Sequence, residues 1–468
     1  MGKNKTDNKY FASEFNMGFV EKDIYFLFNT LRGNFVKFSR DAKDTLGWLA
    51  ESRNKIKKYN SNGIDKRWKT IPDDLKKVMI SGGFVVPQEF NEDAYLRFRN
   101  KAARFNLNSL SLTVLPTTNC NLRCKYCYEC LSKDCMSPKV AKHLLDFVKT
   151  QLERGIKDLS VCWYGGEPLL RYKQICELSR KFISSCKKYK ARYSGSIITN
   201  GVLFTRERAK KLKKLGVTFA QITLDGPPDV HDKRRPSPKG GSFNKILKNV
   251  CDTCDLININ LRCNIDKSNV NDAKKLVDIL VEKGLQKKVY VYFAPVHDSF
   301  NVSSAVCKNY GSGCNKLYSF KDFAPLESEL TKYAEKKGFK IEEPPQRRFS
   351  ACTADMLNSF VVEPKGGLQK CWEYVGTETE QIGTLSEGVD LDEKTLKWYN
   401  YDPFLIRKCK TCKIFPACLG WCPARLLVDK SEASCQTMKF NLIAKLKNYY
   451  KSGIWKKQNK STTSSIKQ

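Results

Sequence analysis

The stretch CNLRCKYC, residues 120–127, holds three cysteines with the spacing C-x3-C-x2-C. It directly follows the apolar run LSLTVL at 110–115, which predicts a buried strand. A structural zinc site or a complete iron–sulfur cluster usually takes four thiolates, so three leave one coordination position open, as in reactive metal centres. Cys130 or Cys135 nearby is an alternative fourth ligand, and a disulfide or a structural zinc ion is a further alternative.

The chain around this stretch alternates between two kinds of pattern. From residue 108, apolar strand-like runs alternate with helical patterns. The strands are expected at 110–115, 158–163, 195–198, 218–224, 258–264 and 288–293, with helices near 138–153, 169–187, 204–215, 242–254 and 270–284. Such alternation predicts an α/β fold with a parallel sheet, and six units predict a partial (β/α)6 barrel. Functional loops of such barrels follow the carboxyl ends of the strands, where the three cysteines lie.

The segments on either side of the barrel predict smaller modules. Residues 1–20 are expected to be a frayed start, and residues 24–39 to form two strands joined by a turn. Helical patterns, a short strand and a connecting helix at 90–105 complete a winged-helix-like module. Residues 351–435 are rich in cysteine and poor in periodicity, so bound metal is expected to supply the folding stability that a small apolar core cannot. The expected parts are the N-terminal module with its linker helix (1–105), the barrel (106–305), a bridging region (306–350), a cysteine-rich domain (351–450) and a disordered tail (451–468).

The composition indicates a globular protein, and its positive charge indicates either acidic partners or only a basic, solvated surface, since the basic residues are spread along the whole chain. Of 468 residues, 41% are hydrophobic and 11% aromatic, and the net charge is +34. This charge favours an acidic peptide or nucleic acid, but no basic run has the interleaved aromatic residues on which bases stack, so nucleic acid is not expected. No signal peptide and no run near the roughly 18 apolar residues of a membrane span is visible, which predicts a cytoplasmic protein without a membrane partner. Twenty cysteines in a cytoplasmic protein indicate metal or redox chemistry rather than disulfides.

The three-cysteine loop resembles that of the radical S-adenosylmethionine (SAM) enzymes. In that family the loop binds a [4Fe–4S] cluster and carries an aromatic residue before its last cysteine, which here is Tyr126. The resemblance implies that Cys120, Cys124 and Cys127 hold the cluster and that SAM binds the open iron. Reduction would cleave SAM to methionine and a 5′-deoxyadenosyl radical, which takes hydrogen from a substrate.

Two further segments resemble the SAM-binding motifs of the family. WYGGEPLL, residues 163–170, looks like its GGEP motif, which implies that Gly165, Gly166 and Glu167 lie at the SAM amino group. QITLDGPPDVHDKRR, residues 221–235, resembles a segment of the peptide- and sulfatase-maturing branch. By that resemblance Thr223 would touch the SAM ribose and Arg235 would pair with the SAM carboxylate.

Between these two segments, ITNG at 198–201 follows the third expected strand as in relatives. His231, one of three histidines, is expected to be a buried, hydrogen-bonded residue rather than a ligand or a base.

A second set of cysteines resembles, in every interval, the seven-cysteine SPASM domain of a branch of radical SAM enzymes. The resemblance implies two auxiliary [4Fe–4S] clusters, one on Cys352, Cys371 and Cys422, and the other on Cys409, Cys412, Cys418 and Cys435. Seven ligands are one short of two full sets. Either Cys307 or Cys314 completes the first cluster, or its open iron binds a substrate thiolate. On spacing alone, a zinc module is an alternative.

These resemblances imply a radical SAM/SPASM maturase, an oxidoreductase that modifies a ribosomally synthesised peptide by a thioether or carbon–carbon cross-link. Its partners would be a precursor peptide and an electron donor such as flavodoxin or ferredoxin. An acidic leader of the peptide would suit a basic surface and could add a strand to the N-terminal module. The alternatives are an anaerobic sulfatase-maturating enzyme, an RNA-modifying radical SAM enzyme and a zinc-stabilised binding protein. In sulfatase maturases an Asp follows the cysteine that corresponds to Cys371, whereas this chain has Trp372 and Glu373 there, which disfavours that alternative.

Overall fold

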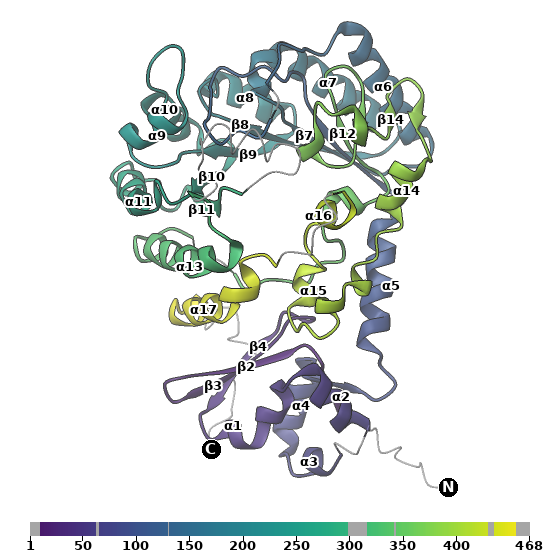
Figure 1. Ribbon diagram of the computed structural model, residues 1–468, viewed down its shortest axis with the longest axis vertical. Coiled ribbons are helices and arrows are strands. Elements are labelled where there is room, and N and C mark those ends of the chain that lie inside the picture. Colours follow the sequence, from purple (N-terminus) through teal and green to yellow (C-terminus); the bar gives the residue numbers. More distant parts are fainter. Residues whose placement is uncertain are drawn as a thin grey trace.

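The computed structural model describes residues 10–61, 65–129, 131–297, 316–340, 343–428 and 435–454. Figure 1 shows the strands and helices of the central part of the chain at one end of the molecule and the N-terminal module at the other, with the C-terminal region between them. Cys130, Cys307 and Cys314 lie outside the described residues, as do residues 1–9 and 455–468 of the expected frayed start and tail.

Six parallel strands form the expected barrel-like sheet. They are β6 (Ser109–Val114), β7 (Asp158–Trp163), β8 (Arg192–Thr199), β9 (Val217–Thr223), β10 (Asn258–Ile265) and β11 (Val289–Pro295), each paired with its neighbours along the chain. The helices between them are α6 (Pro138–Glu153), α7 (Tyr172–Lys188), α8 (Arg206–Lys214), α9 (Pro228–Arg234), α10 (Phe243–Thr253) and α11 (Ala273–Glu282). The predicted α/β fold with a partial barrel is therefore confirmed.

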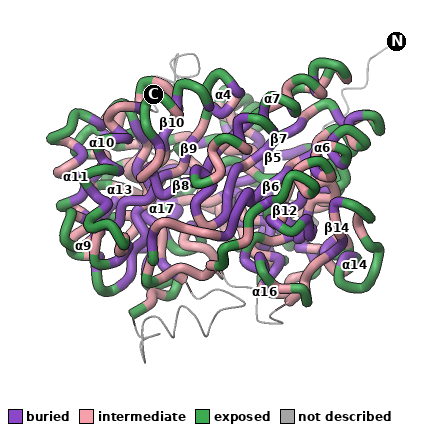
Figure 2. Tube along the Cα trace, turned by 90° about the horizontal axis from the view of Figure 1, so that it is seen from above, coloured by how far each residue is buried: buried purple, intermediate pink, exposed green. Residues whose placement is uncertain are grey.

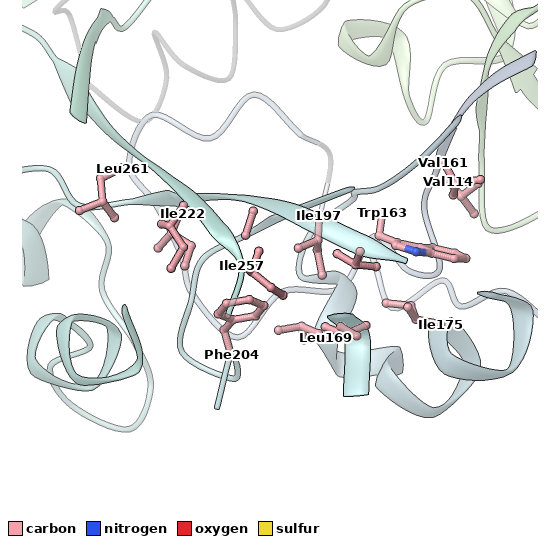
Figure 3. Packing of buried hydrophobic residues seen from close by; sticks show 14 of the residues in the cluster. Val114, Val161, Trp163, Leu169, Ile175, Ile197, Phe204, Ile222, Ile257 and Leu261 are labelled. Carbon is pink, nitrogen blue, oxygen red and sulfur yellow. The ribbon is translucent and has the colours of Figure 1, made fainter. Parts of the chain in front are cut away.

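The two faces of this sheet differ in chemistry. Alternate residues such as Leu110, Leu112 and Val114 of β6 are buried against the helices, in one large apolar core. Figure 3 shows this packing around Trp163 and Phe204, and Figure 2 shows the buried strands enclosed by partly exposed helices. The opposite face carries half-buried polar residues such as Ser111 and Thr113. The apolar core thus lies outside the barrel, and the inner face is left polar.

Two strands of the cysteine-rich region extend the same sheet. β12 (Ser359–Val362) pairs in parallel with β6, and β13 (Leu368–Gln369) pairs antiparallel with β12. The sequence did not predict them, because all four residues of β12 are buried and the run SFVV therefore lacks the alternation of a half-buried strand. The sheet joins the predicted SAM-binding and auxiliary regions.

The N-terminal module begins earlier than expected. β1 (Tyr10–Ala12) pairs with β5 (Val85–Pro87), and β2 (Asn16–Glu21) pairs with β3 (Ile24–Asn29), which in turn pairs with β4 (Phe35–Ser39). The expectation of a frayed start over residues 10–20 is therefore wrong. Gly18 obscured β2 in the sequence, but a Cβ at this position would lie 2.4 Å from the Tyr25 hydroxyl, so close packing requires glycine there.

The helices of the module cover one face of its three-stranded sheet. They are α1 (Ala42–Leu46), η1 (Gly47–Ala50), α2 (Arg53–Ser61), α3 (Asp65–Lys69) and α4 (Asp73–Ser81). The other face packs on α17 (Met438–Lys451) and on Ile414 and Ala417 of the cysteine-rich region. Lys413 of that region donates to the carbonyls of Asn16 (2.6 Å) and Ala50 (2.7 Å).

The linker helix α5 (Glu92–Arg104) fastens the cysteine-rich region through one buried arginine. Arg104 donates to the carbonyls of Asp355, Trp398, Tyr399 and Tyr401 at 2.5–3.1 Å, and its guanidinium lies 3.5 Å from the Asp355 carboxylate. Only 4% of its side chain is exposed. Trp398 and Tyr399 lie in α14 (Glu393–Tyr399), so Arg104 holds the end of this helix and the turn after it.

We expect Arg104→Met to lower the free energy of unfolding by about 3–5 kcal/mol, because it leaves a buried carboxylate and several carbonyls without their donor. Arg97→Met on the same helix is the matched control, since its ion pair with Asp402 is 40% exposed on the arginine side and contributes about 1 kcal/mol or less. Urea unfolding followed by tryptophan fluorescence measures both. Equal losses from the two variants would contradict this role of Arg104.

Candidate functional site

The loop with the first three cysteines is fixed at the carboxyl edge of the sheet. It leaves β6 and is bonded to the end of α9, where Arg123 N donates to Pro236 O (2.9 Å) and Lys125 N to Arg234 O (3.0 Å). Within the loop, Cys127 N donates to Cys124 O (3.1 Å). The three thiols are half-buried on this one short, anchored segment, and their common binding of a cluster stays a prediction.

Two glycines after β7 let the chain pass close to the start of this loop. A Cβ on Gly165 would lie 2.3 Å from Thr117 O, and one on Gly166 would lie 2.4 Å from Asn119 O. Gly165 also has a positive φ of 109°, which favours glycine. Gly166 N and Glu167 N donate to the loop carbonyls of Thr117 and Asn119. The GGEP segment thus supports the cysteine loop through its backbone.

The Glu167 carboxylate links the segments that follow β7 and β8. Its carboxylate accepts from Leu169 N (2.9 Å), Thr199 Oγ1 (2.7 Å) and Asn200 N (2.8 Å), and the side chain is fully buried. Asn200 in turn donates to Asn121 Oδ1 in the cysteine loop (2.8 Å). This network connects the ITNG segment after β8 to the loop, and the contact of Glu167 with SAM stays a prediction.

Tyr126 is held by a cluster of polar groups at the ends of β9 and β10. Its hydroxyl donates to Asp225, and it accepts from Arg235 (2.5 Å) and Asn264 (3.1 Å). Asp225 also accepts from the Asn264 backbone N–H (2.9 Å). Arg235 is 7% exposed, and its Nε has no hydrogen-bond partner among the described residues. A buried donor of this kind fits a bound carboxylate, and Thr223, 9% exposed, lies at the end of β9 nearby in the chain.

A cavity of about 750 Å³ opens beside the loop. Its walls include Cys124 and Cys127 from the loop, and Lys233 and Arg234 from α9. Arg234 is buried and forms an ion pair with Asp266 (2.7 Å). The cavity borders two of the three thiols, and its size is within the range of small-molecule sites.

His231 is structural, as expected. It is fully buried, its Nδ1 accepts from Asp225 N (3.2 Å) and its Nε2 lies 3.1 Å from the Ser242 hydroxyl. Burial lowers the pKa of His231 to about 3, so the ring is neutral at physiological pH. Its hydrogen bonds fix Asp225, which holds Tyr126.

The seven cysteines of the second set fall into two groups. Burial raises the pKa of Cys371 well above its usual range, and the neighbouring thiols of Cys352 and Cys422 add to the effect. Burial raises the pKa of Cys409 to about 12, and the thiols that add to it are those of Cys412, Cys418 and Cys435. These electrostatic neighbours agree with the two sets implied by the resemblance to the SPASM domain. Among the described residues, however, no three Cys, His, Asp or Glu side chains form a group that could hold a metal ion, so metal binding by these sets stays a prediction.

A left-handed turn separates Cys418 and Cys422, which fall into different groups. Leu419, Gly420 and Trp421 have φ angles of 50°, 78° and 63°, although two of them are not glycine. Each non-glycine residue in this conformation costs about 1–2 kcal/mol. The turn reverses the chain, so that cysteines four positions apart can serve different centres.

The thiols of the first loop fit an iron–sulfur cluster chemically. Burial raises the pKa of Cys120 to about 11 and that of Cys124 as well, so both are protonated near neutral pH in the absence of a cation. A metal centre supplies the positive charge that converts such thiols into thiolate ligands. Three thiols, supporting glycine backbone and an unpartnered buried guanidinium together fit a cluster with SAM.

Residues 114–299 match the family model of the radical SAM superfamily. The chain carries a radical SAM domain. It is 28% identical over 345 residues to a cysteine-type anaerobic sulfatase-maturating enzyme of Clostridium novyi, covering 68% of this chain and 88% of that protein. It is 23% identical to a serine-type enzyme of Klebsiella aerogenes, covering 68% of this chain and 80% of that protein. The expected resemblance to radical SAM enzymes is thus confirmed, and these relatives are enzymes.

Solved structures of this superfamily share the fold. The structure of anSMEcpe with bound AdoMet matches with a TM-score of 0.54 and 20% identity, over 75% of this chain and 98% of that one. SuiB of Streptococcus suis, bound to its precursor peptide SuiA, matches with a TM-score of 0.51 and 15% identity, over 92% of this chain and 99% of that one. The predicted cofactors, namely a SAM-binding [4Fe–4S] cluster, SAM and auxiliary clusters, agree with a radical SAM domain in a chain similar to sulfatase-maturating enzymes. No described helix is long and apolar enough to cross a bilayer.

Sequence analysis missed several residues of the site. Asp225 and Asn264 position Tyr126, and Asn200 bonds to the cysteine loop. Asp225 lies within the quoted segment 221–235, two residues after the end of β9 at Thr223, and this position was the available signal. Asn200 belongs to the ITNG segment at 198–201, which was its signal, whereas Asn264 carries none, because only the strand order brings it beside Tyr126.

We expect Gly166→Ala to reduce the iron bound by the first loop and to lower SAM cleavage about tenfold or more. The added Cβ would overlap Asn119 O, and relief of such overlap typically costs about 1–3 kcal/mol. Gly47→Ala is the matched control, because its nearest neighbour lies at 3.6 Å. Iron analysis and chromatography of 5′-deoxyadenosine measure the effect. Full activity of Gly166→Ala would contradict this role of the glycine.

Proposed function

We propose that this protein is a radical SAM/SPASM maturase that modifies a ribosomally synthesised peptide. The observation that carries the proposal is a radical SAM domain whose C-x3-C-x2-C loop lies at the carboxyl edge of the sheet, followed by seven cysteines with the spacing of a SPASM domain. When bound, the cluster and SAM supply a 5′-deoxyadenosyl radical, which takes a hydrogen atom from the substrate.

The residues of this chain have distinct roles in the proposed site. Cys120, Cys124 and Cys127 hold the cluster and leave one iron without a protein ligand. The backbone at Gly165 and Gly166 receives the SAM amino group. In the same site, the unpartnered Nε of Arg235 pairs with the SAM carboxylate and Thr223 contacts its ribose, while Tyr126 keeps Arg235 in place.

The N-terminal module supports a peptide as the substrate class. Its sheet packs directly on the cysteine-rich region, so a peptide bound there would lie on the same body as the auxiliary centres. SuiB, which is matched over 92% of this chain, is bound to a precursor peptide. Of the two outer strands, β2 is bonded through Asn16 O to Lys413, so the predicted strand addition would use β4. The net charge of +34 suits an acidic leader.

Sulfatase maturation is the second candidate function. Two sulfatase-maturating enzymes align with 68% of this chain at 28% and 23% identity, which supports this candidate as well. The sequence at Cys371-Trp372-Glu373 departs from the Asp expected there in sulfatase maturases. The two candidates share the same radical chemistry and differ in the peptide that enters the site.

We expect anaerobically reconstituted, reduced protein to convert SAM to 5′-deoxyadenosine, and Cys124→Ala to abolish this conversion because the cluster loses a ligand. Cys135→Ala is the matched control, since Cys135 is exposed at the end of the same loop. Chromatography of the products measures both variants. Full turnover by Cys124→Ala, or loss of turnover by Cys135→Ala, would contradict the three-thiolate site.

A panel of peptides distinguishes the two candidate functions. We expect a short peptide encoded beside the gene to lose hydrogen on incubation with the reduced enzyme and SAM, because formation of a cross-link removes hydrogen atoms. A sulfatase-derived peptide should stay unchanged under the same conditions. High-resolution mass spectrometry measures both products, and modification of the sulfatase peptide alone would support the second candidate instead.

A further inference from the structure

Two buried side chains between the two groups of auxiliary cysteines have hydrogen-bond donors without partners. Tyr401 is 5% exposed and Trp398 is 1% exposed. The Tyr401 hydroxyl and the Trp398 Nε1 make no hydrogen bond to any of the described residues. Native proteins rarely leave a buried donor without an acceptor, because the desolvated group loses its hydrogen bonds to water. Each of these two donors is therefore expected to have an acceptor.

Tyr401 lies against the second group of cysteines. It belongs to an apolar cluster with Leu419 and Phe415, onto which Cys409 and Cys412 pack. A Cβ on Gly420, in the turn between Cys418 and Cys422, would lie 2.9 Å from the Tyr401 hydroxyl. The hydroxyl therefore faces the left-handed turn itself.

Trp398 lies against the first group of cysteines. It packs with Tyr374, Ala354 and Ala424, and Cys371 and Cys422 contact this cluster. Trp398 and Tyr401 are three residues apart, and Arg104 holds both backbones through their carbonyl oxygens (3.1 Å and 2.5 Å). One rigid segment thus presents two donors, each toward a different group of thiols.

We propose that Tyr401 and Trp398 are positioning residues that donate hydrogen bonds to sulfur atoms of the auxiliary centres, Tyr401 to the centre on Cys409, Cys412, Cys418 and Cys435, and Trp398 to the centre on Cys352, Cys371 and Cys422. This inference rests on the proposed function, which supplies the two centres. Hydrogen bonds to cluster sulfur stabilise the reduced form and raise the reduction potential. The segment 398–401, which Arg104 holds through its carbonyl oxygens, would therefore adjust the potentials of both centres.

The test is a redox titration of the auxiliary centres followed by electron paramagnetic resonance. The full chain carries Cys124→Ala, which removes the signal of the SAM-binding cluster, and is reconstituted with iron and sulfide. Cys409→Ala in the same background identifies the signal of the second centre. Into this background we introduce Tyr401→Phe, Trp398→Phe and the matched control Tyr399→Phe, whose hydroxyl already donates to Leu357 O (3.4 Å).

We expect Tyr401→Phe to lower the potential of the second centre alone, at unchanged iron content, and Trp398→Phe to lower the potential of the first centre alone. Tyr399→Phe should leave both unchanged. Unchanged potentials in Tyr401→Phe, or an equal shift in Tyr399→Phe, would overturn the inference. Reconstituted wild-type protein with only about four irons per chain, the content of a single [4Fe–4S] cluster, would instead overturn the proposed auxiliary centres themselves.

Discussion

The proposed chemistry depends on one constraint, which is that three thiols lie on one short, fixed loop at the edge of a sheet. No fourth thiol is among the predicted ligands of that loop. The strand before the loop fixes one end, and the end of α9 fixes the other through backbone hydrogen bonds. Gly165 and Gly166 come so close to the loop carbonyls that no side chain fits between them. The geometry of the loop is therefore set by backbone contacts, and the hydrogen bonds of Tyr126 with Asp225 and Arg235 add to them.

The sheet and the linker helix make the separate regions one body. β12 adds a strand of the cysteine-rich region to the edge of the barrel sheet at β6, next to the loop strand. Arg104 of α5 and Lys413 tie the same region to the N-terminal part of the chain through buried hydrogen bonds. Ordering such long, flexible cations is costly, and their buried hydrogen bonds fix the relative positions of the regions.

Sequence patterns predicted individual strands and helices but missed contacts between segments that are far apart in the sequence. The strand at 158–163 and the helix at 138–153 agree with β7 and α6, because alternation and helical periodicity are properties of neighbouring residues. The cysteine groups were predicted only through resemblance to a family. The hydrogen bonds of Glu167 were not predicted, because they depend on β8 lying beside β7. The strand β12 was missed because burial on both faces removes the alternating pattern.

The central claim is that one iron of the first cluster is left by the protein for SAM. Electron–nuclear double resonance of the reduced cluster, recorded with SAM labelled with ¹³C in the carboxylate and ¹⁵N in the amino group, tests this directly. The account predicts hyperfine coupling of both labels to the cluster, since both groups would chelate that iron. A cluster with full iron content and no coupling to either label would show that the position is closed, and would contradict the account.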